Sequence, residues 1–99
     1  MKELVFTRRF ERDFRRLKKR LPPQALDYDT LEHLFELLQS GIALPEAFRE
    51  RALRGELAGF LECHIDADCL LIYRVTRSRV VFHRIGTHSE LFRSRRGRG

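Results

Sequence analysis

The apolar run Cys69–Val75 (CLLIYRV) constrains the fold more than any other segment. It is rich in Leu, Ile, Tyr and Val, carries one charge and is bounded by polar residues, which is typical of a strand buried on both faces. The flanking segments Leu57–Ile65 and Arg79–Ile85 are strand-like and are separated from it by short polar turns. These segments predict three consecutive antiparallel strands. A short helical turn capped by Thr87 or Ser89 is expected after them.

The N-terminal part of the sequence predicts a strand and two helices. Leu4–Phe6 is a short strand that should join the sheet, and Thr7 is expected to cap a helix with a regular apolar stripe. The stripe consists of Phe10, Phe14, Leu17 and Leu21. Pro22–Pro23 is expected to end this helix and to start a second one, which runs to about Ser40 with Gly41 as its C′ residue. The two helices are expected to pair as an antiparallel hairpin.

The predicted order is β-α-α-β-β-β followed by a short helix, an α+β domain with a helical hairpin packed on a mostly antiparallel sheet. Ile42–Gly55 is predicted to have little regular structure apart from one turn near Pro45. Residues 1–92 should form a single domain, and the basic tail Arg93–Gly99 is expected to be disordered. There is no apolar run of about 18 residues and no signal-peptide pattern, so a cytoplasmic protein is expected.

Positive charge is concentrated in two blocks of this chain, whose formal net charge is +6. Arg8–Arg20 carries eight basic and two acidic side chains, and Arg93–Gly99 carries four arginines. The segment between the blocks is acidic. Such blocks favour a polyanionic partner, nucleic acid in particular. A solvated basic helix face with a frayed tail is the alternative interpretation.

The two cysteines, Cys63 and Cys69, predict no disulfide framework and lack the spacing of a metal site. We interpret them as small buried hydrophobic residues in a reducing compartment. A three-residue turn centred on Asp66 would place them opposite one another.

Candidate chemistry centres on His64, Asp68 and His88. The same three-residue turn would place His64 opposite Asp68, and a histidine–carboxylate pair fixes the imidazole tautomer and raises its basicity. His88 follows the adjacent strand and can lie at the same end of the sheet. Two acid–base groups around one site suit RNA cleavage by the 2′-hydroxyl, with Phe92 stacking on a base.

Each of these residues also has a structural interpretation. A histidine at a strand end commonly has a packing role, and an aspartate in a turn is ordinary turn chemistry. Phe92 could seal the core instead of contacting a base. His83, in the middle of a strand, is expected to be a packing or surface residue.

Several short motifs make the sequence resemble a known family. They are Ala52–Gly55 (ALRG), Glu62–Ile65 (ECHI), Asp68, Leu70–Tyr73 (LLIY) and Gly86–Phe92 (GTHSELF). With them the chain resembles the RelE/ParE superfamily of bacterial type II toxins, and its YafQ-like branch, over residues 1 to about 92. The resemblance implies the RelE-like toxin fold. It also implies a ribosome-dependent mRNA endonuclease that uses the transcript's own 2′-hydroxyl and inhibits translation.

The resemblance further implies site residues and partners. By family match, His64, Asp68 and His88 occupy the catalytic positions, His88 being the general acid. The expected RNA-binding residues are Arg51, Phe92, Arg84, Arg15, Lys18 and Lys19. The implied partners are the 70S ribosome with its mRNA and a cognate antitoxin. No membrane, metal or small-molecule cofactor is implied.

Two positions depart from the family pattern. Arg51 stands where the family often has histidine, and Leu61 stands where it often has arginine. Arginine cannot act as an acid or base near neutral pH, although it can bind phosphate. We therefore also consider a catalytically impaired or non-catalytic toxin-fold protein, either a ParE-like inhibitor of a protein target or an RNA-binding module. A general DNA-binding domain is disfavoured because no recognition-helix motif is present.

Overall fold

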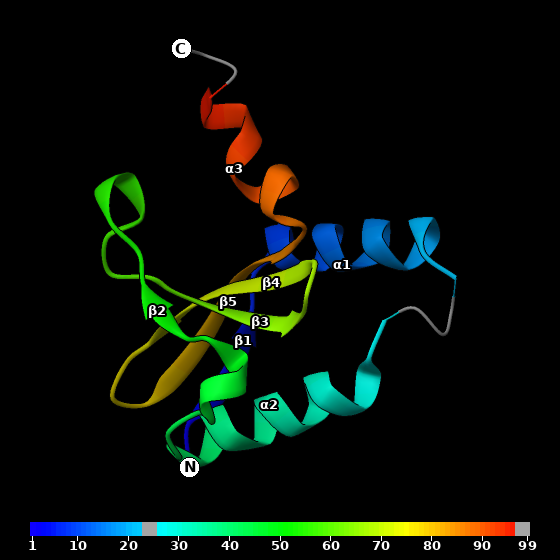
Figure 1. Cartoon of the computed structure of the whole chain (residues 1–99). Coiled ribbons are helices and arrows are strands. Elements are labelled where there is room, and N and C mark those ends of the chain that lie inside the picture. Colours follow the sequence, from blue (N-terminus) through cyan, green and yellow to red (C-terminus); the bar gives the residue numbers. More distant parts are fainter. Residues whose placement is uncertain (23–25, 97–99) are drawn as a thin grey trace.

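The structure is a computed structural model that describes residues 1–22 and 26–96 (Figure 1). Its elements are β1 (Glu3–Phe6), α1 (Arg8–Arg20), α2 (Tyr28–Ser40), the 3-10 turn η2 (Glu46–Phe48), β2 (Arg51–Ala52), the 3-10 turn η3 (Gly55–Leu57), β3 (Leu61–Asp66), β4 (Cys69–Val75), β5 (Arg79–Gly86) and α3 (His88–Arg96). None of the helices in the described part of the chain is long and apolar enough to cross a membrane.

The five strands form one sheet in the order β1-β5-β4-β3-β2. β1 is parallel to β5, and the remaining neighbours are antiparallel. The prediction of an α+β domain with a mostly antiparallel sheet is therefore confirmed. β4 lies in the middle of the sheet and its first five residues are buried, as its apolar run predicts.

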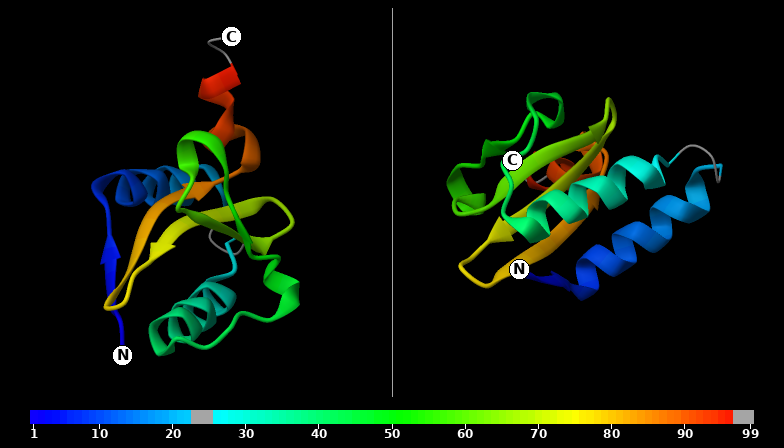
Figure 2. Two further views of the ribbon diagram at one scale, coloured as in Figure 1. Left: turned by 90° about the vertical axis from the view of Figure 1, so that its left-hand side faces the viewer. Right: turned by 90° about the horizontal axis from the view of Figure 1, so that it is seen from below.

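The two long helices cover one face of the sheet, and α3 lies on the other side (Figure 2). The predicted cap is confirmed, because the Phe10 amide donates to Thr7 Oγ1 at 3.0 Å. The C′ residue of α2 is also confirmed, since Gly41 has a φ of 74°. The prediction that the prolines start the second helix is wrong. α2 begins at Tyr28, where Asp27 caps the helix, and Pro23 lies outside the described residues.

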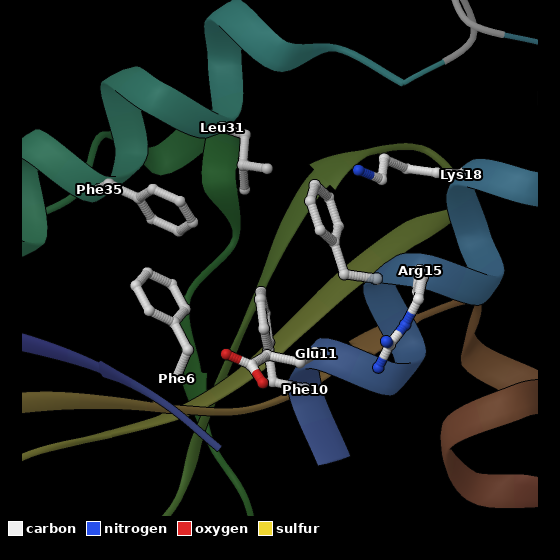
Figure 3. Close-up of a pocket in the computed structure, with 8 residues that line it drawn as sticks. Phe6, Phe10, Glu11, Arg15, Lys18, Leu31 and Phe35 are labelled. Carbon is white, nitrogen blue, oxygen red and sulfur yellow. The ribbon is translucent and has the colours of Figure 1, made fainter. Parts of the chain in front are cut away.

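α1 and α2 run in opposite directions, as expected, but an open groove of about 330 Å³ separates part of their length. Its apolar lining includes Phe6 of β1, Phe10 of α1 and Phe35 of α2, and Arg15 and Lys18 reach it from α1 (Figure 3). Phe6 and Phe35 pack edge to face at 5.5 Å, so β1 joins the two helices at the floor of the groove.

Two further element boundaries differ from the prediction, and one strand was not predicted. The strand expected from Leu57 begins at Leu61, because η3 and Gly59, with a φ of 96°, occupy the preceding residues. The unpredicted strand β2 pairs with the edge of β3. The expected C-terminal turn is a nine-residue helix that continues to Arg96. The rest of the predicted tail, residues 97–99, lies outside the described residues.

Candidate functional site

The face of the sheet opposite α1 and α2 carries the predicted site. Residues directly opposite one another in an antiparallel ladder point to the same face. Leu70 of β4 pairs with His64 of β3 and with Gly86 of β5. The next row places Ile72 between Glu62 and Arg84. This face has a small apolar floor formed by Leu70, Ile72 and Leu91, with Leu53, Leu57, Phe60 and Phe92 packed against it.

Glu62 links two of the candidate residues at the β2–β3 edge. It is 2% exposed, and its Oε2 accepts a hydrogen bond from Arg51 Nε at 2.9 Å. The same oxygen lies 3.9 Å from His64 Nε2. Glu62 Oε1 is buried and has no hydrogen-bond partner among the described residues. Arg51 is therefore held beside His64 through one shared carboxylate.

His88 and Phe92 lie one turn apart at the start of α3, with their ring centroids separated by 4.8 Å. The helix starts with a capping box, in which the Thr87 amide donates to Glu90 Oε1 and the Glu90 amide donates to Thr87 Oγ1. Burial alone would raise the pKa of Glu90. The hydrogen bond from the Thr87 amide and the Arg20 guanidinium, whose Nη1 lies 2.5 Å from Glu90 Oε2, outweigh burial, so the pKa of Glu90 is lowered. α3 is thus anchored at the end that carries His88.

Gly86 is required for this close approach of α3 to β5. A Cβ atom at Gly86 would lie 2.9 Å from Glu90 Oε1 and 3.3 Å from Leu91 Cδ2. The first residue of the GTHSELF motif therefore leaves room for the capping box and for the packing of Leu91.

The predicted pairing of His64 with Asp68 is wrong. The hairpin turn has two residues, Ala67 and Asp68, instead of the three centred on Asp66 that were expected, so Asp66 pairs with Cys69. A register irregularity between His64 and Asp66 accommodates one extra residue of β3, and His64 pairs with Leu70. Asp68 instead lies in the exposed hairpin turn, where its amide donates to Asp66 Oδ1 at 2.9 Å. The structure therefore brings His64 to a carboxylate, but the carboxylate is that of Glu62.

The two cysteines are buried free thiols, as interpreted from the sequence. The expected pairing of Cys63 with Cys69 is wrong for the same reason, since Cys63 lies opposite Leu71. Burial raises the pKa of each thiol to about 12.

Arg84 lies on the site face but is strongly engaged by the protein. Its Nε and Nη2 donate to the two carboxylate oxygens of Asp13 at 2.8 and 2.9 Å, and this carboxylate raises the pKa of Arg84. The Asp13 carboxylate also accepts from the Ile85 amide at 3.3 Å. Asp13 thus joins α1 to the edge of β5 beyond the end of β1, a role that the sequence pattern did not indicate.

His83 packs against Phe60, with ring centroids 4.8 Å apart, and so behaves as the packing residue expected. It also lines a cavity of about 230 Å³ together with Arg9, Arg84 and Leu91. Burial, followed by the nearby charges of Arg9 and Arg84, lowers the pKa of His83.

The three α1 residues predicted to bind RNA, Arg15, Lys18 and Lys19, share no cavity with His64 or His88 in the described part of the chain. Arg15 and Lys18 line the groove between α1 and α2, on the opposite side of the sheet. Arg15 also lines a basic surface pocket of about 260 Å³ together with Lys19. Leu61 also belongs to the helix-covered side, since it packs against the main core there. Of the two departures from the family pattern, Arg51 alone contacts the site.

Sequence reasoning missed Glu62, although a signal for it was present. Glu62 and His64 are two residues apart on a strand, so their side chains point to the same face. The partners Asp13 and Arg84 are 71 residues apart, and no local pattern predicts their contact.

The mostly antiparallel five-stranded sheet, with two helices on one face and histidine and arginine side chains on the other, is consistent with the class of RelE-like toxins. A family model described as "Bacterial toxin of type II toxin-antitoxin system, YafQ" matches residues 2–93. The mRNA interferase toxin YafQ of Escherichia coli is 28% identical over 92 residues, which cover 92% of this chain and 96% of that protein. The chain therefore belongs to the YafQ family of bacterial type II toxins.

Solved structures agree with this assignment. The crystal structure of a copper-bound mutant toxin from Helicobacter pylori matches with a TM-score of 0.83 and 33% identity, covering 93% of this chain and all of that one. The toxin in the crystal structure of the E. coli DinJ–YafQ complex matches with a TM-score of 0.78 and 28% identity, covering 93% and 99% of the two chains. Within the part of the present chain that is described, no group of three or more His, Cys, Asp or Glu side chains could hold a metal ion.

Proposed function

We propose that this protein is the toxin of a type II toxin–antitoxin system and acts in the cytoplasm as a ribosome-dependent mRNA endonuclease. The observation that carries the proposal is the YafQ family match over residues 2–93, which includes His64, Asp68 and His88. The E. coli relative is named an mRNA interferase toxin. The placement of His64 on the open sheet face and of His88 at the anchored end of α3 supports the same function.

The proposed reaction is attack of a ribose 2′-oxygen on the adjacent phosphorus. The bond from phosphorus to the 5′-oxygen breaks, which leaves a 2′,3′-cyclic phosphate and a 5′-hydroxyl. His64 or Asp68 takes the proton of the 2′-hydroxyl, and His88 donates a proton to the departing 5′-oxygen. No metal or small-molecule cofactor takes part in this scheme.

Substrate binding is assigned to aromatic and basic side chains. Phe92, already against the His88 ring, would stack on a base next to the cut. Arg51 and Arg84 on the site face would bind RNA phosphates. Arg84 would do so with the guanidinium donors that its hydrogen bonds to Asp13 leave free. Arg15, Lys18 and Lys19 on α1 would face ribosomal RNA, since they lie away from the cleavage site.

The proposed partner besides the ribosome is a cognate antitoxin, because a related YafQ toxin was crystallised with DinJ. The open groove between α1 and α2 is a suitable surface for part of it. An amphipathic acidic helix would bury the exposed Phe6 ring and place its carboxylates near Arg15 and Lys18. Phe6→Asp should therefore weaken antitoxin binding.

The test is primer extension on an mRNA that is being translated in a bacterial extract containing this protein. A His88→Ala variant and a ribosome-free sample are the controls. Discrete cuts that require both ribosomes and His88 would support the endonuclease. Ribosome binding without cuts would favour the second candidate, a non-catalytic RNA-binding toxin fold, for which the replacement of the family histidine by Arg51 is the specific observation. Neither cuts nor ribosome binding would refute both.

A further inference from the structure

We infer that Glu62 is a positioning residue that holds Arg51 beside His64, so that Arg51 stabilises negative charge on the reacting phosphate. The inference rests on the proposed endonuclease function and deepens it. Arg51 occupies a position that often holds a histidine in the family, and the inference assigns it charge stabilisation instead of acid–base chemistry. The acid–base steps stay with the histidines and Asp68, and Arg51 supplies a permanent positive charge.

The geometry brings two side chains to one carboxylate oxygen. Glu62 Oε2 lies 2.9 Å from Arg51 Nε and 3.9 Å from His64 Nε2, so the guanidinium and the imidazole are neighbours. Arg51 uses only Nε in this contact, and its side chain is 66% exposed. Its two terminal nitrogens therefore remain available to a phosphate, which arginine binds with paired donors.

Backbone pairing reinforces the side-chain contact. Arg51 and Glu62 are directly opposite one another in the antiparallel pair formed by β2 and β3. β2 is only two residues long, and one of them is Arg51. The short strand thus sets the position of the Arg51 backbone, and Glu62 sets the direction of its side chain.

Burial of Glu62 makes the contact directional. A carboxylate that is 2% exposed is costly unless a positive group or hydrogen-bond donors compensate its charge. Oε1 has no partner among the described residues, so Arg51 is the one donor that the described structure gives to this carboxylate. The compensation requires the guanidinium to stay at Oε2, and therefore beside His64.

The chemical consequence concerns the charge of the transition state. Attack by the 2′-oxygen places extra negative charge on the non-bridging oxygens of the phosphorus. A fixed guanidinium stabilises this charge without reorganisation, and loss of such a group typically slows catalysis by about 10²–10³-fold. Glu62 does not contact the phosphate in this scheme and acts only through Arg51.

The experiment compares Arg51→Gln, Glu62→Gln and the double variant in single-turnover cleavage on translating ribosomes. Each single variant should cut at least about tenfold more slowly, because loss or misplacement of a charged donor weakens charge stabilisation. The double variant should cut no more slowly than the slower single variant, because each change disables the same Arg51–Glu62 pair. Ribosome binding, measured by co-sedimentation, should change little. Arg54→Ala is the control, because it removes one positive charge from the same segment.

The inference would be overturned if Glu62→Gln cut RNA at the wild-type rate. It would also be overturned if the rate losses of the two single variants multiplied in the double variant. Thermal unfolding will show whether Glu62→Gln is folded. If Glu62→Gln is not folded, the cleavage rates of Arg51→Gln and Arg51→Lys decide instead, because the Arg51 side chain is exposed and its replacement should not disturb the fold. Full activity in both variants would contradict the proposed role.

A spectroscopic measurement separates this inference from the proposed function. In ¹⁵N NMR spectra the Arg51 Nε–H should be distinct from that of Arg54 and protected from exchange, and Arg51→Lys should perturb the His64 ring signals. If the wild-type protein does not cut RNA but this signature is present, only the endonuclease proposal fails. If Arg51 exchanges as fast as Arg54, the positioning role fails whether or not the protein cuts RNA.

Discussion

The ion pair between Asp13 and Arg84 allows a quantitative test of what holds α1 to the sheet. The two side chains are 5% and 13% exposed. Replacing Asp13 by alanine removes two hydrogen bonds from the guanidinium and one from the Ile85 amide. Arg84 would then be a largely buried charge without its partner.

The expected loss of unfolding free energy is about 3 kcal/mol. Breaking a buried ion pair from one side costs roughly 3–5 kcal/mol, because the remaining charge is uncompensated. The lower end applies here, since the guanidinium keeps some contact with water. For a domain of this size, a loss of about 3 kcal/mol corresponds to a decrease in Tm of roughly 12–24 °C.

Urea denaturation and thermal unfolding followed by circular dichroism will measure this loss. Glu32→Ala is the control, because it removes an exposed carboxylate from α2 and should change stability by no more than about 0.5 kcal/mol. In the combined variant Asp13→Leu/Arg84→Met, much of the stability should return, because apolar residues of similar volume can replace a buried ion pair. A cost below about 1 kcal/mol for Asp13→Ala would refute the reasoning.

Three further predictions concern the core and α3. Cys63 and Cys69 should resist alkylation at pH 8 in the folded protein and react in denaturant, because burial raises the pKa of both thiols to about 12; rapid labelling of the native protein would contradict this. Gly86→Ala should cost about 1 kcal/mol in urea denaturation, since the new Cβ displaces the Glu90 cap; unchanged stability would show that the cap can move freely. The pKa of Glu90 is lowered on folding, so its stabilisation is complete above the unfolded value near 4.5 and is lost as the pH falls through the lower folded value. Glu90→Gln should flatten the fall in unfolding free energy over that acid range, and an unaltered pH dependence would contradict the assignment.

Local patterns in the sequence determined most of the helices and strands, although not β2 or the start of α2. β4 followed from a short apolar run between polar turns, and Thr7 and Gly41 marked helix ends through their side-chain and backbone chemistry. These features depend on residues within one or two turns of one another, so they can be read without knowing the fold. The same is true of the GTHSELF motif, in which Gly86 and the Thr87–Glu90 capping box lie within five residues.

Only the tertiary structure decided which groups meet at the site. The two-residue turn of the β3–β4 hairpin separated His64 from Asp68, and the pairing of β2 with β3 gave Glu62 the partner Arg51. The contact of Asp13 with Arg84 required α1 to pack beside the end of β5. Registers and long-range contacts depend on the combined packing of both sheet faces, and a shift by one residue reverses every side chain of a strand. The chemistry available to this chain was therefore present in its residues, but its arrangement was set by contacts distant in sequence.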